Sequence, residues 1–339
     1  MKLLSVAVPC FNSAAYMDHC ISTLVSGGED MEVIIVNDGS TKDNTAEIAD
    51  SWAERYPTIV KAVHQENAGH GGACMKGLAN ATGLYFKVVD SDDWVDEDVL
   101  RQILGKLREF SKMEKPVDLL ISNFVYDKVG VEKKQSIDYR SAFPVNKVFT
   151  WDEFGHFEVG HYMLMHAMIY RREVLIKSGM VMPKHTFYVD NIYATVPLKD
   201  VETMYYLNVN FYHYFIGRDD QSVQQATMIK RIDQQLRVNK ELFEQVDVAS
   251  IKHPKQQKVI LDYQEIITTV SSVLCLIDGS EELLAKKAEL WAWLKENHPW
   301  EYKKIRYGFY GIAMNLPGKP GRDIAKWGYK VANKFVSFN

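Results

Sequence analysis

Three carboxylates follow an apolar run in the first third of the chain. Residues 88–94 read V-V-D-S-D-D-W, so Asp90, Asp92 and Asp93 come directly after residues typical of a strand. Because an unpaired carboxylate is costly to bury, we expect a positive group nearby. Asp90 and Asp92 can turn toward one point and offer hard oxygen ligands to Mg²⁺ or Mn²⁺, leaving positions for phosphate oxygens, while Asp93 orients the loop. For a D-x-D alone, a solvated acidic turn explains the pattern equally well.

Two other polar segments could contact a nucleotide. In N-D-G-S (37–40), Asp38 can accept hydrogen bonds from a nucleobase N–H and a ribose hydroxyl, although an Asx turn is the favoured interpretation of this tetrapeptide. N-A-G-H-G-G-A (67–73) could bring backbone N–H groups and a helix N-terminus to a phosphate, with Lys76 one turn further in. A flexible glycine turn is the alternative. His70 could contact a diphosphate, although a solvent-facing loop histidine is the favoured interpretation. No G-x-G-x-x-G with a following acidic residue occurs, which argues against a dinucleotide site.

These segments follow short runs rich in Val, Ile and Leu. Such runs are typical of strands buried on both faces, and they lie at 3–9, 32–37, 59–63 and 84–89. Amphipathic stretches separate them, and the second begins with Asn44 and has Glu47 three residues later, a capping-box pattern. The alternation predicts an α/β fold with a mostly parallel sheet and helices on both faces. Ligands bind at the carboxyl ends of such strands, so the polar segments should share one rim.

The later chain changes character. Asp96 can cap a helix through about residue 113, and 117–125 is a further strand. The remaining expected elements are a functional loop or small β-excursion at 127–150, alternating helices and strands at 151–215, and amphipathic helices at 227–246, 255–277 and 281–296. We therefore predict a domain at 1–220, with halves 1–125 and 126–220, and a helical region at 221–339 that could support a homodimer.

Composition narrows the class of protein. The chain has 339 residues and a net charge of −4, so no global charge favours nucleic-acid binding. Its four cysteines show no C-x-x-C pair or metal-ligand spacing, which suits a reducing cytoplasm. Pro9 and Asn12 interrupt the first apolar run before a secretory signal could form. No run of about eighteen apolar residues occurs, so we expect no transmembrane helix.

The last part of the chain has a different charge balance. Residues 303–339 contain eight Lys and Arg residues against Asp323 alone, interleaved with seven aromatic residues. A basic, aromatic, amphipathic tail can lie on an anionic membrane surface, which would place the protein peripherally at the inner face of the cell membrane. A terminal helix docked on its own domain with a solvated basic face explains the pattern equally well.

Taken together, four segments resemble the ordered motifs of family 2 glycosyltransferases with the GT-A fold. They are V-A-V-P-C-F-N-S (6–13), E-V-I-I-V-N-D-G-S-T (32–41), H-Q-E-N-A-G-H-G-G-A (64–73) and G-L-Y-F-K-V-V-D-S-D-D-W-V (83–95). The resemblance covers roughly the first 125 residues. It implies inverting transfer from a nucleotide-diphosphate sugar, usually a uridine one, to a glycan or lipid-linked acceptor, as in surface-polysaccharide assembly. It also implies a divalent metal, Mn²⁺ or Mg²⁺, on the D-x-D motif.

The resemblance also assigns the donor site. In that assignment Pro9, Phe11 and Asn12 line the base, Asp38 holds the uracil or ribose side, Asn67, Gly69 and Lys76 lie near ribose and diphosphate, and Asp90, Ser91 and Asp92 serve ribose and metal. The loop departs from the family in having Cys74-Met75-Lys76 where many members carry Ala-Arg-Asn.

A fainter resemblance extends into the acceptor half. In F-Y-V-D-N (187–191), Val189 stands where the family usually has glutamate, which leaves Asp190 as the catalytic base. Arg218 is a candidate for the diphosphate. His213 is either a metal ligand or a packed histidine, and Trp94 either contacts the sugar or acceptor or is a wedge under the loop.

Three other functions compete with this interpretation. A catalytically silent sugar-nucleotide scaffold or sensor would keep the donor site, and Val189 leaves room for it. A nucleotidyltransferase also uses paired aspartates, but P-C-F-N-S (9–13) stands where its glycine-rich loop would follow the first strand. A nicotinamide dehydrogenase lacks its fingerprint here.

Overall fold

The structure is a computed structural model, and it describes all residues except 1, 129, 132–133, 159, 217–223 and 337–339. The chain divides into two compact units, Met1–Asp219 and Asp220–Asn339. The boundary expected near residue 220 and the candidate Arg218 lie outside the described residues.

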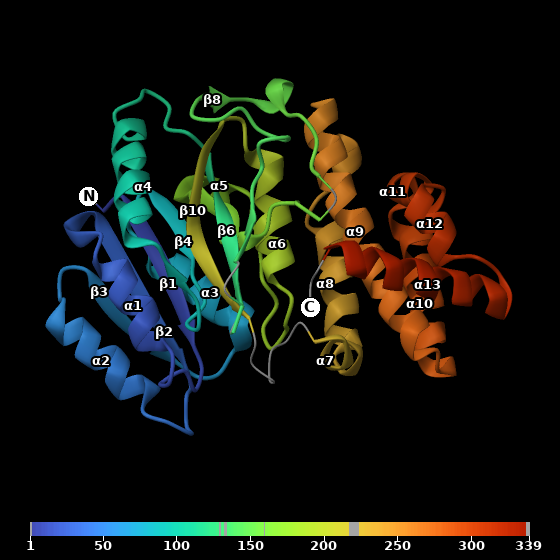
Figure 1. Cartoon of the computed structure of the whole chain (residues 1–339), viewed down its shortest axis with the longest axis horizontal. Coiled ribbons are helices and arrows are strands. Elements are labelled where there is room, and N and C mark those ends of the chain that lie inside the picture. The colour runs from blue at the N-terminus through green and yellow to red at the C-terminus, as the bar shows by residue number, and fades with distance from the viewer. Residues whose placement is uncertain (1, 129, 132–133, 159, 217–223, 337–339) are drawn as a thin grey trace. The chain divides into compact units, whose positions relative to one another are not determined.

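The first unit is built on one sheet with the strand order β3-β2-β1-β4-β9-β6-β10-β5 (Figure 1). The strands are β1 (Leu4–Cys10), β2 (Met31–Asp38), β3 (Val60–Gln65), β4 (Tyr85–Val88), β5 (Trp94–Val95), β6 (Leu119–Lys128), β9 (Met168–Arg171) and β10 (Met204–Ile216). The pairings β1–β2, β1–β4, β2–β3 and β6–β10 are parallel. Each antiparallel pairing spans only two or three residue pairs. The predicted α/β fold with a mostly parallel sheet is confirmed.

Burial explains why the apolar runs become strands. Every residue of β1 and β2 is buried, as expected for central strands of a parallel sheet. β3 differs, because only Val60 is buried and the rest of the strand is partly or fully exposed. The prediction that this run is buried on both faces is therefore wrong, since β3 forms the edge of the sheet.

Helices follow the strands of the first half. They are α1 (Met17–Val25), α2 (Thr45–Arg55), α3 (Gly69–Asn80) and α4 (Glu97–Phe110). Asp96 caps α4 as predicted, and its carboxylate accepts a hydrogen bond from the Val99 N–H at 2.9 Å. The predicted capping box at Asn44 is wrong, because the Asn44 side chain makes no cap bond and Asp43 accepts the Thr45 N–H instead, at 3.1 Å.

The segment between β6 and β10 contains the predicted small β-excursion. β7 (Gln135–Ile137) pairs with β6, and β8 (Val148–Phe149) pairs with β10. Two short helices then follow β9, namely α5 (Arg172–Lys177) and α6 (Asp190–Thr195). α6 begins at the candidate base.

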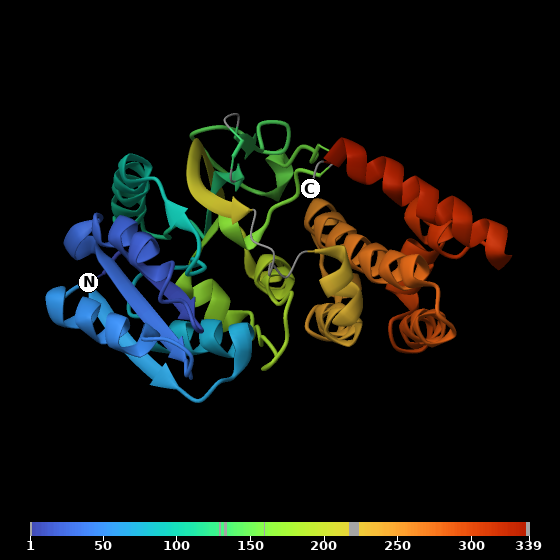
Figure 2. The ribbon, with the colours of Figure 1, turned by 60° about the horizontal axis from the view of Figure 1, so that its bottom comes forward.

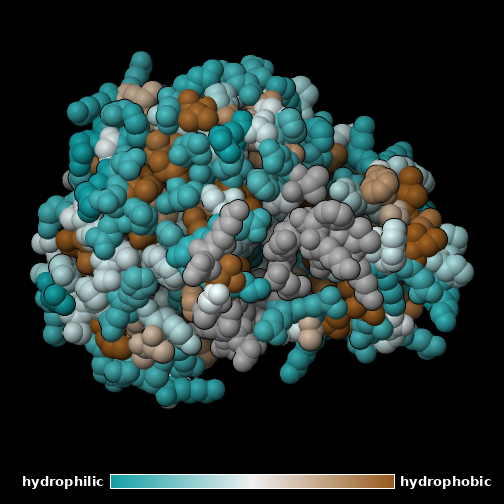
Figure 3. All heavy atoms as spheres, viewed as in Figure 1, coloured by the Kyte–Doolittle hydropathy of each residue, from teal (hydrophilic) through white to brown (hydrophobic). Residues whose placement is uncertain are grey.

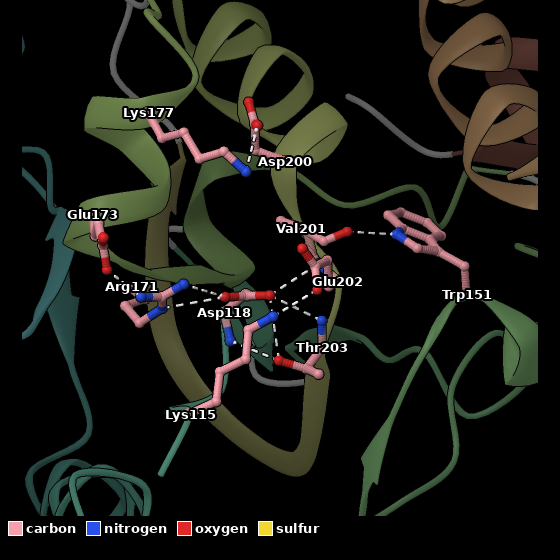
Figure 4. A network of polar contacts seen from close by, with 10 residues as sticks. All are labelled: Lys115, Asp118, Trp151, Arg171, Glu173, Lys177, Asp200, Val201, Glu202 and Thr203. Atoms are coloured by element: carbon pink, nitrogen blue, oxygen red, sulfur yellow. Dashed lines mark hydrogen bonds and ion pairs between the residues drawn. The ribbon is translucent and has the colours of Figure 1, made fainter. Parts of the chain in front are cut away.

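A polar network lies at the end of the sheet where strands β6 and β10 begin (Figure 4). The buried carboxylate of Asp118 accepts hydrogen bonds from the Arg171 guanidinium at 2.7 and 3.1 Å. Its second oxygen accepts from the backbone N–H groups of Glu202 and Thr203 at 2.9 and 3.0 Å. Because both oxygens are paired, this buried charge is compensated in place.

The second unit is helical. Its helices are α7 (Gln225–Lys230), α8 (Ile232–Glu244), α9 (Pro254–Asp278), α10 (Glu281–Asn297), α11 (Pro299–Arg306), α12 (Phe309–Met314) and α13 (Gly318–Val336). The predicted helix 227–246 is split at Arg231. α9 lies among α8, α10, α12 and α13 (Figure 2).

Helix α9 bears on the expectation that the chain has no membrane span. By length and composition α9 is long and apolar enough to cross a membrane, and 61% of its apolar window is buried inside the protein. Core helices of soluble proteins pass the same test. α9 contains no unbroken apolar run of about eighteen residues, because Asp262, Gln264 and Glu265 interrupt it.

Candidate active site

Hydrogen bonds join the polar segments that follow β1, β2, β3 and β4. The Asn12 N–H donates to the Ser40 hydroxyl at 2.9 Å, and the Ala68 N–H donates to the Asp38 carboxylate at 2.8 Å. The Ser91 hydroxyl donates to the Ser13 hydroxyl at 2.9 Å. The four predicted segments therefore meet at one rim of the sheet, as the parallel topology requires.

Asp38 lies almost fully buried at the end of β2. One of its carboxylate oxygens accepts from both the Ala68 N–H and the Gln65 side-chain amide, the latter at 2.7 Å. The Asn67 amide donates to the Asp38 backbone carbonyl at 3.1 Å. Asp38 thus fixes the segment that leads into α3, a role that the local N-D-G-S pattern does not reveal.

The three residues predicted to line a base differ in their exposure. Pro9 is buried in β1, whereas the Phe11 ring is 50% exposed. Asn12 adopts a left-handed backbone with φ 51°, and its side-chain carbonyl accepts the N–H groups of Thr41 and Lys42 at 3.2 and 3.1 Å. Phe11 therefore offers a ring surface at the rim, and Asn12 holds the loop after β2.

The glycine-rich segment packs closely against the chain that leads to Asp190. A Cβ added at Gly69, where φ is +74°, would lie 2.8 Å from the backbone of His185, and one at Gly71 would lie 2.8 Å from the Pro183 carbonyl. The His185 N–H donates to the Ala68 carbonyl at 2.7 Å. The glycines thus allow two backbones to meet, a packing role that the sequence did not indicate.

α3 begins at Gly69, within the glycine-rich segment. Lys76 therefore lies about two turns from the helix N-terminus, and not one turn as predicted. Lys76 is exposed, and it lies about 10 Å along the helix axis from Gly69.

His70 pairs with the first aspartate of the D-x-D motif. Its Nε2 lies 2.8 Å from Oδ1 of Asp90, and the two side chains are 29% and 26% exposed. Burial opposes a charge on His70, but Cys74 and Asp90 outweigh it and raise the pKa of the imidazole well above its usual value. Burial also opposes the charge of Asp90, yet His70 helps to hold its pKa below the usual range. The prediction of a solvent-facing His70 is therefore wrong.

Asp93 connects the D-x-D loop to β10. Its carboxylate accepts from the Tyr212 hydroxyl at 2.5 Å and from the Phe215 N–H at 2.8 Å. The Tyr212 oxygen in turn accepts from the Asp90 N–H at 3.2 Å. Burial, together with the nearby charges of Asp92 and Asp90, raises the pKa of Asp93 well above its usual value. Asp93 orients the loop, as the sequence predicted.

A buried lysine lies beneath the acidic loop. The Lys87 amine donates to the backbone carbonyls of His166, Met165 and Met168 at 2.6, 3.4 and 3.4 Å. Burial lowers the pKa of Lys87 to about 7, although Asp90 and Asp93 act in the opposite direction. Lys87 and His70 are the positive groups that the acidic cluster was expected to need. The missed signal for Lys87 was a lysine inside the apolar run Y-F-K-V-V.

The His166 ring lies near the same cluster. It is buried, and neither of its nitrogens has a hydrogen-bond partner in the described part of the chain. Burial lowers the pKa of His166 to about 3, so the ring is neutral.

Asp190 lies close enough to the D-x-D loop to interact with it electrostatically. Burial raises the pKa of Asp190 to about 6, with Asp90 acting in the same direction and His70 against it. Two residues before it, Tyr188 has a left-handed backbone with φ 67°, a conformation that is strained for a bulky residue. The structure therefore brings the candidate base and the strand-end carboxylates together, although they are far apart in the sequence.

Trp94 and His213 pack against each other. Their rings stack with centroids 5.4 Å apart and planes 11° from parallel, and the His19 ring lies 5.0 Å from Trp94. His213 Nδ1 lies 3.2 Å from the Asp127 carboxylate. These contacts agree with the packed interpretation of both residues and do not favour His213 as a metal ligand.

Comparison with known proteins gives the family. The model of "Glycosyl transferase family 2" matches residues 5–175. The chain belongs to this family. Its relatives include the uncharacterized glycosyltransferase EpsJ of Bacillus subtilis, 27% identical over 225 residues that make up 63% of this chain and 61% of EpsJ. Glycosyltransferase GlyG of Streptococcus pneumoniae is 36% identical over 126 residues, 36% of this chain and 39% of GlyG. The chain thus spans less than two thirds of the curated relatives it matches.

Two solved structures share the fold. TarS 1–349 of S. aureus in complex with UDP-GlcNAc superimposes with a TM-score of 0.68 at 15% identity, covering 98% of this chain and 92% of TarS. The mannosyltransferase PcManGT from Pyrobaculum calidifontis, in complex with GDP-Man and Mn²⁺, has a TM-score of 0.52 at 15% identity, covering 99% of this chain and 87% of PcManGT. At this identity the likeness shows the fold, and it confirms the GT-A-like architecture.

The residues after β4 bear on whether the site can hold a metal ion. Among the residues that the structure describes, no group of three or more His, Cys, Asp and Glu side chains could hold one. Asp90 and Asp92 do supply hard oxygen donors, and Mg²⁺ commonly binds one or two carboxylates together with substrate phosphates. The donor set therefore fits an ion that binds together with a diphosphate. An ion on Asp90 would share that carboxylate with His70.

Proposed function

We propose that this chain is an inverting glycosyltransferase, which moves a sugar from a UDP-linked donor to a hydroxyl of a glycan or lipid-linked acceptor. The observation that carries the proposal is the approach of Asp190, with its raised pKa, to the carboxylates at the end of β4. Raised pKa values in a cluster of carboxylates are typical of catalytic sites. The UDP-GlcNAc complex of TarS and the GDP-Man complex of PcManGT support a nucleotide-sugar donor.

In the proposed reaction the acceptor hydroxyl attacks the anomeric carbon of the donor. A new C–O bond forms on one face of the sugar while the bond to the diphosphate breaks on the other, so the configuration inverts. Asp190 takes the proton of the hydroxyl. Because its pKa is about 6, the carboxylate is mostly ionised at neutral pH and remains a competent base. Such general-base catalysis is usually worth about 100- to 10,000-fold in rate.

On the donor side we propose that Asp90 and Asp92 hold Mn²⁺ or Mg²⁺ against the diphosphate. Such an ion would stabilise the developing charge of the leaving group by several kcal/mol. His70 holds Asp90 in place, and Asp93 fixes the loop to β10. Phe11 is the proposed contact for the nucleobase of the donor.

The remaining predicted residues belong to the same proposal. Asp38, Asn67 and Gly69 form the proposed ribose side, and the hydrogen bond from the Asn67 amide to the Asp38 carbonyl supports the grouping of the first two. Lys76 and Arg218 stay predictions for the diphosphate. All four cysteines are buried and free, which supports the proposal of a cytoplasmic location.

Isothermal titration calorimetry with UDP, GDP and dTDP, each with and without Mn²⁺, tests the donor site. We expect UDP to bind in the presence of Mn²⁺ and this binding to disappear in Asp92→Ala. Asp98→Ala is the matched control, because Asp98 is an aspartate on the first turn of α4 whose side chain is 84% exposed. Equal UDP affinity with and without metal would contradict the metal assignment. Tight binding of GDP, but not of UDP, would indicate a GDP-linked donor in place of the UDP-linked one.

A catalytically silent sugar-nucleotide scaffold is the second candidate. Val189, fully buried, occupies the place where the family usually has a glutamate, so it supplies no acid or base. The release of UDP from a panel of UDP-sugars distinguishes the two functions. Release that Asp190→Asn abolishes supports the transferase, whereas UDP binding without any release supports the scaffold. Release of pyrophosphate from UTP and a sugar 1-phosphate, in a separate assay, would instead indicate a nucleotidyltransferase.

A further inference from the structure

Six large apolar side chains lie exposed on α12, on α13 and in the turn between α11 and α12. They are Tyr307 (68%), Phe309 (81%), Tyr310 (46%), Ile312 (49%), Ile324 (60%) and Trp327 (68%), and we call them the exposed aromatic set. Isolated exposed apolar residues are common on protein surfaces, but a concentration of this size in one short segment marks an interaction site. In Figure 3 hydrophobic side chains gather over α11 and α12.

The same helices also bury an apolar face of their own. Ile305 of α11, Met314 of α12 and Ala325 of α13 belong to the core of the second unit. On α13, Ile324 and Trp327 are three residues apart and therefore neighbours on the helix surface. The exposed aromatic set is thus a second apolar surface in addition to the one that folding already covers.

Two members of the set lie at the start of α12, where α11 and α12 approach each other closely. A Cβ added at Gly311 would lie 2.0 Å from the Ile305 carbonyl, so only glycine allows the two helices to approach this closely. Phe309 and Tyr310 lie side by side at the start of α12, with ring centroids 5.4 Å apart. Their exposure is therefore built into the fold.

Basic residues alternate with the exposed aromatic set along the chain. Residues 303–329 contain six Lys and Arg residues and a single acidic residue, Asp323, in a chain whose net charge is −4. Lys303, Lys304 and Lys319 are exposed. Exposed aromatic residues beside lysines are the composition of segments that lie in the interface of an anionic membrane, with rings at headgroup depth and ammonium groups on the lipid phosphates.

We propose that the exposed aromatic set and its lysines bind the surface of a membrane that contains anionic lipids. Charge complementarity decides for this occupant over a second copy of the chain. An interface between two copies related by a twofold axis would bring two of these basic surfaces together, which like charges oppose. Peripheral binding would hold the enzyme near an acceptor carried on a lipid, but it stands apart from the proposed transfer reaction.

Vesicle co-sedimentation of the full chain tests the proposal directly. We expect the protein to pellet with vesicles of mixed phosphatidylglycerol and phosphatidylcholine, and much less with phosphatidylcholine alone. The double variant Phe309→Ser with Trp327→Ser should lose at least about tenfold in affinity for the vesicles, since it removes two side chains that would insert into the membrane interface. The matched control is Met113→Ser with Ile176→Ser, two exposed apolar residues of the first unit, and it should bind like the wild type.

A charge series separates the electrostatic contribution. Replacing Lys303, Lys304 and Lys319 by Gln should lower the affinity about fivefold for each residue at low salt, and added salt should weaken binding. Melting temperatures equal to that of the wild type would show that the variants are folded, since all the changed side chains are exposed.

Three results would overturn the proposal. They are absence of binding to anionic vesicles, equal binding of the control and the Phe309→Ser/Trp327→Ser variant, and self-association that this variant abolishes. The last result, measured by size exclusion with light scattering, would assign the surface to a second copy. None of these results bears on UDP binding or sugar transfer, so the two proposals fail separately.

Discussion

In the first unit, the network around the buried carboxylate of Asp118 and the carboxylate cluster after β4 are organised in opposite ways. Asp118, at the start of β6, has both oxygens occupied by the Arg171 guanidinium and by backbone N–H groups (Figure 4). At the end of β4 several carboxylates lie close to one another, and the pKa values of Asp93 and Asp190 are raised. A carboxylate that the fold compensates completely stabilises the fold, whereas a cluster that repels itself is suited to receive a cation or a proton.

The positive groups of the two clusters differ as well. Arg171 donates hydrogen bonds to Asp118 through two guanidinium nitrogens, and an arginine keeps its charge at any physiological pH. The cluster after β4 instead has His70, an imidazole, and Lys87, whose pKa burial lowers to about 7. The groups that can gain or lose a proton near neutral pH thus lie in the candidate active site, and the permanently charged arginine lies in the Asp118 network.

The largest expected effect that separates the clusters comes from Asp190→Asn. We expect the rate of sugar transfer to fall by about 100- to 10,000-fold, because the base is lost. The affinity for UDP should stay the same, and the melting temperature should rise slightly, since the fold disfavours the charge of Asp190. Steady-state kinetics, calorimetry and thermal melting on one preparation check all three. A loss of UDP affinity as large as the loss of rate would show that Asp190 holds the donor instead.

Asp118→Ala should have the opposite effect. Removing one partner of a buried ion pair leaves Arg171 without its buried partner and two backbone N–H groups unpaired, which typically costs about 3–5 kcal/mol of unfolding free energy. Urea unfolding measures this loss. The transfer rate per folded molecule should remain near that of the wild type. A large fall in this rate would mean that the Asp118 network and the candidate active site are coupled.

The pH dependence sharpens the comparison further. The folded pKa of Asp190 is about 6, above its ordinary value of 3.8, so the base is ionised at neutral pH and becomes protonated as the pH falls through 6. Below that point kcat/KM should decrease about tenfold for each pH unit. Because the folded pKa lies above the ordinary value, the charge of Asp190 lowers the free energy of unfolding at neutral pH. This destabilisation disappears in acid, where the carboxyl is protonated in both states. A rate profile that is flat from pH 7 to 5 would exclude Asp190 as the base.

The smallest effect is expected at the outer end of the Asp118 network. Glu173 is 76% exposed and contacts Arg171 from the solvent side. Surface ion pairs contribute about 0–1 kcal/mol, so Glu173→Ala should change the unfolding free energy by less than about 1 kcal/mol. A change as large as that of Asp118→Ala would show that Arg171 depends on both of its partners.

Local patterns predicted much of this protein. β1 and β2 follow from unbroken apolar runs, because central strands of a parallel sheet are buried on both faces. Asp96 was predictable as a cap, since its effect extends only three residues. The Asn44 cap failed at the same range because the neighbouring Asp43 takes its place, and residue type alone does not rank two adjacent caps.

The sequence by itself determined the family, the order of strands and helices, and the residue types at the rim, since these depend on short patterns of burial and spacing. Only the tertiary structure decided which groups face each other. It placed His70 on Asp90, Gly69 against His185, and Asp190 near both charges. Such contacts join segments that are distant in the chain, and a pKa depends on burial and on charges that no local pattern contains.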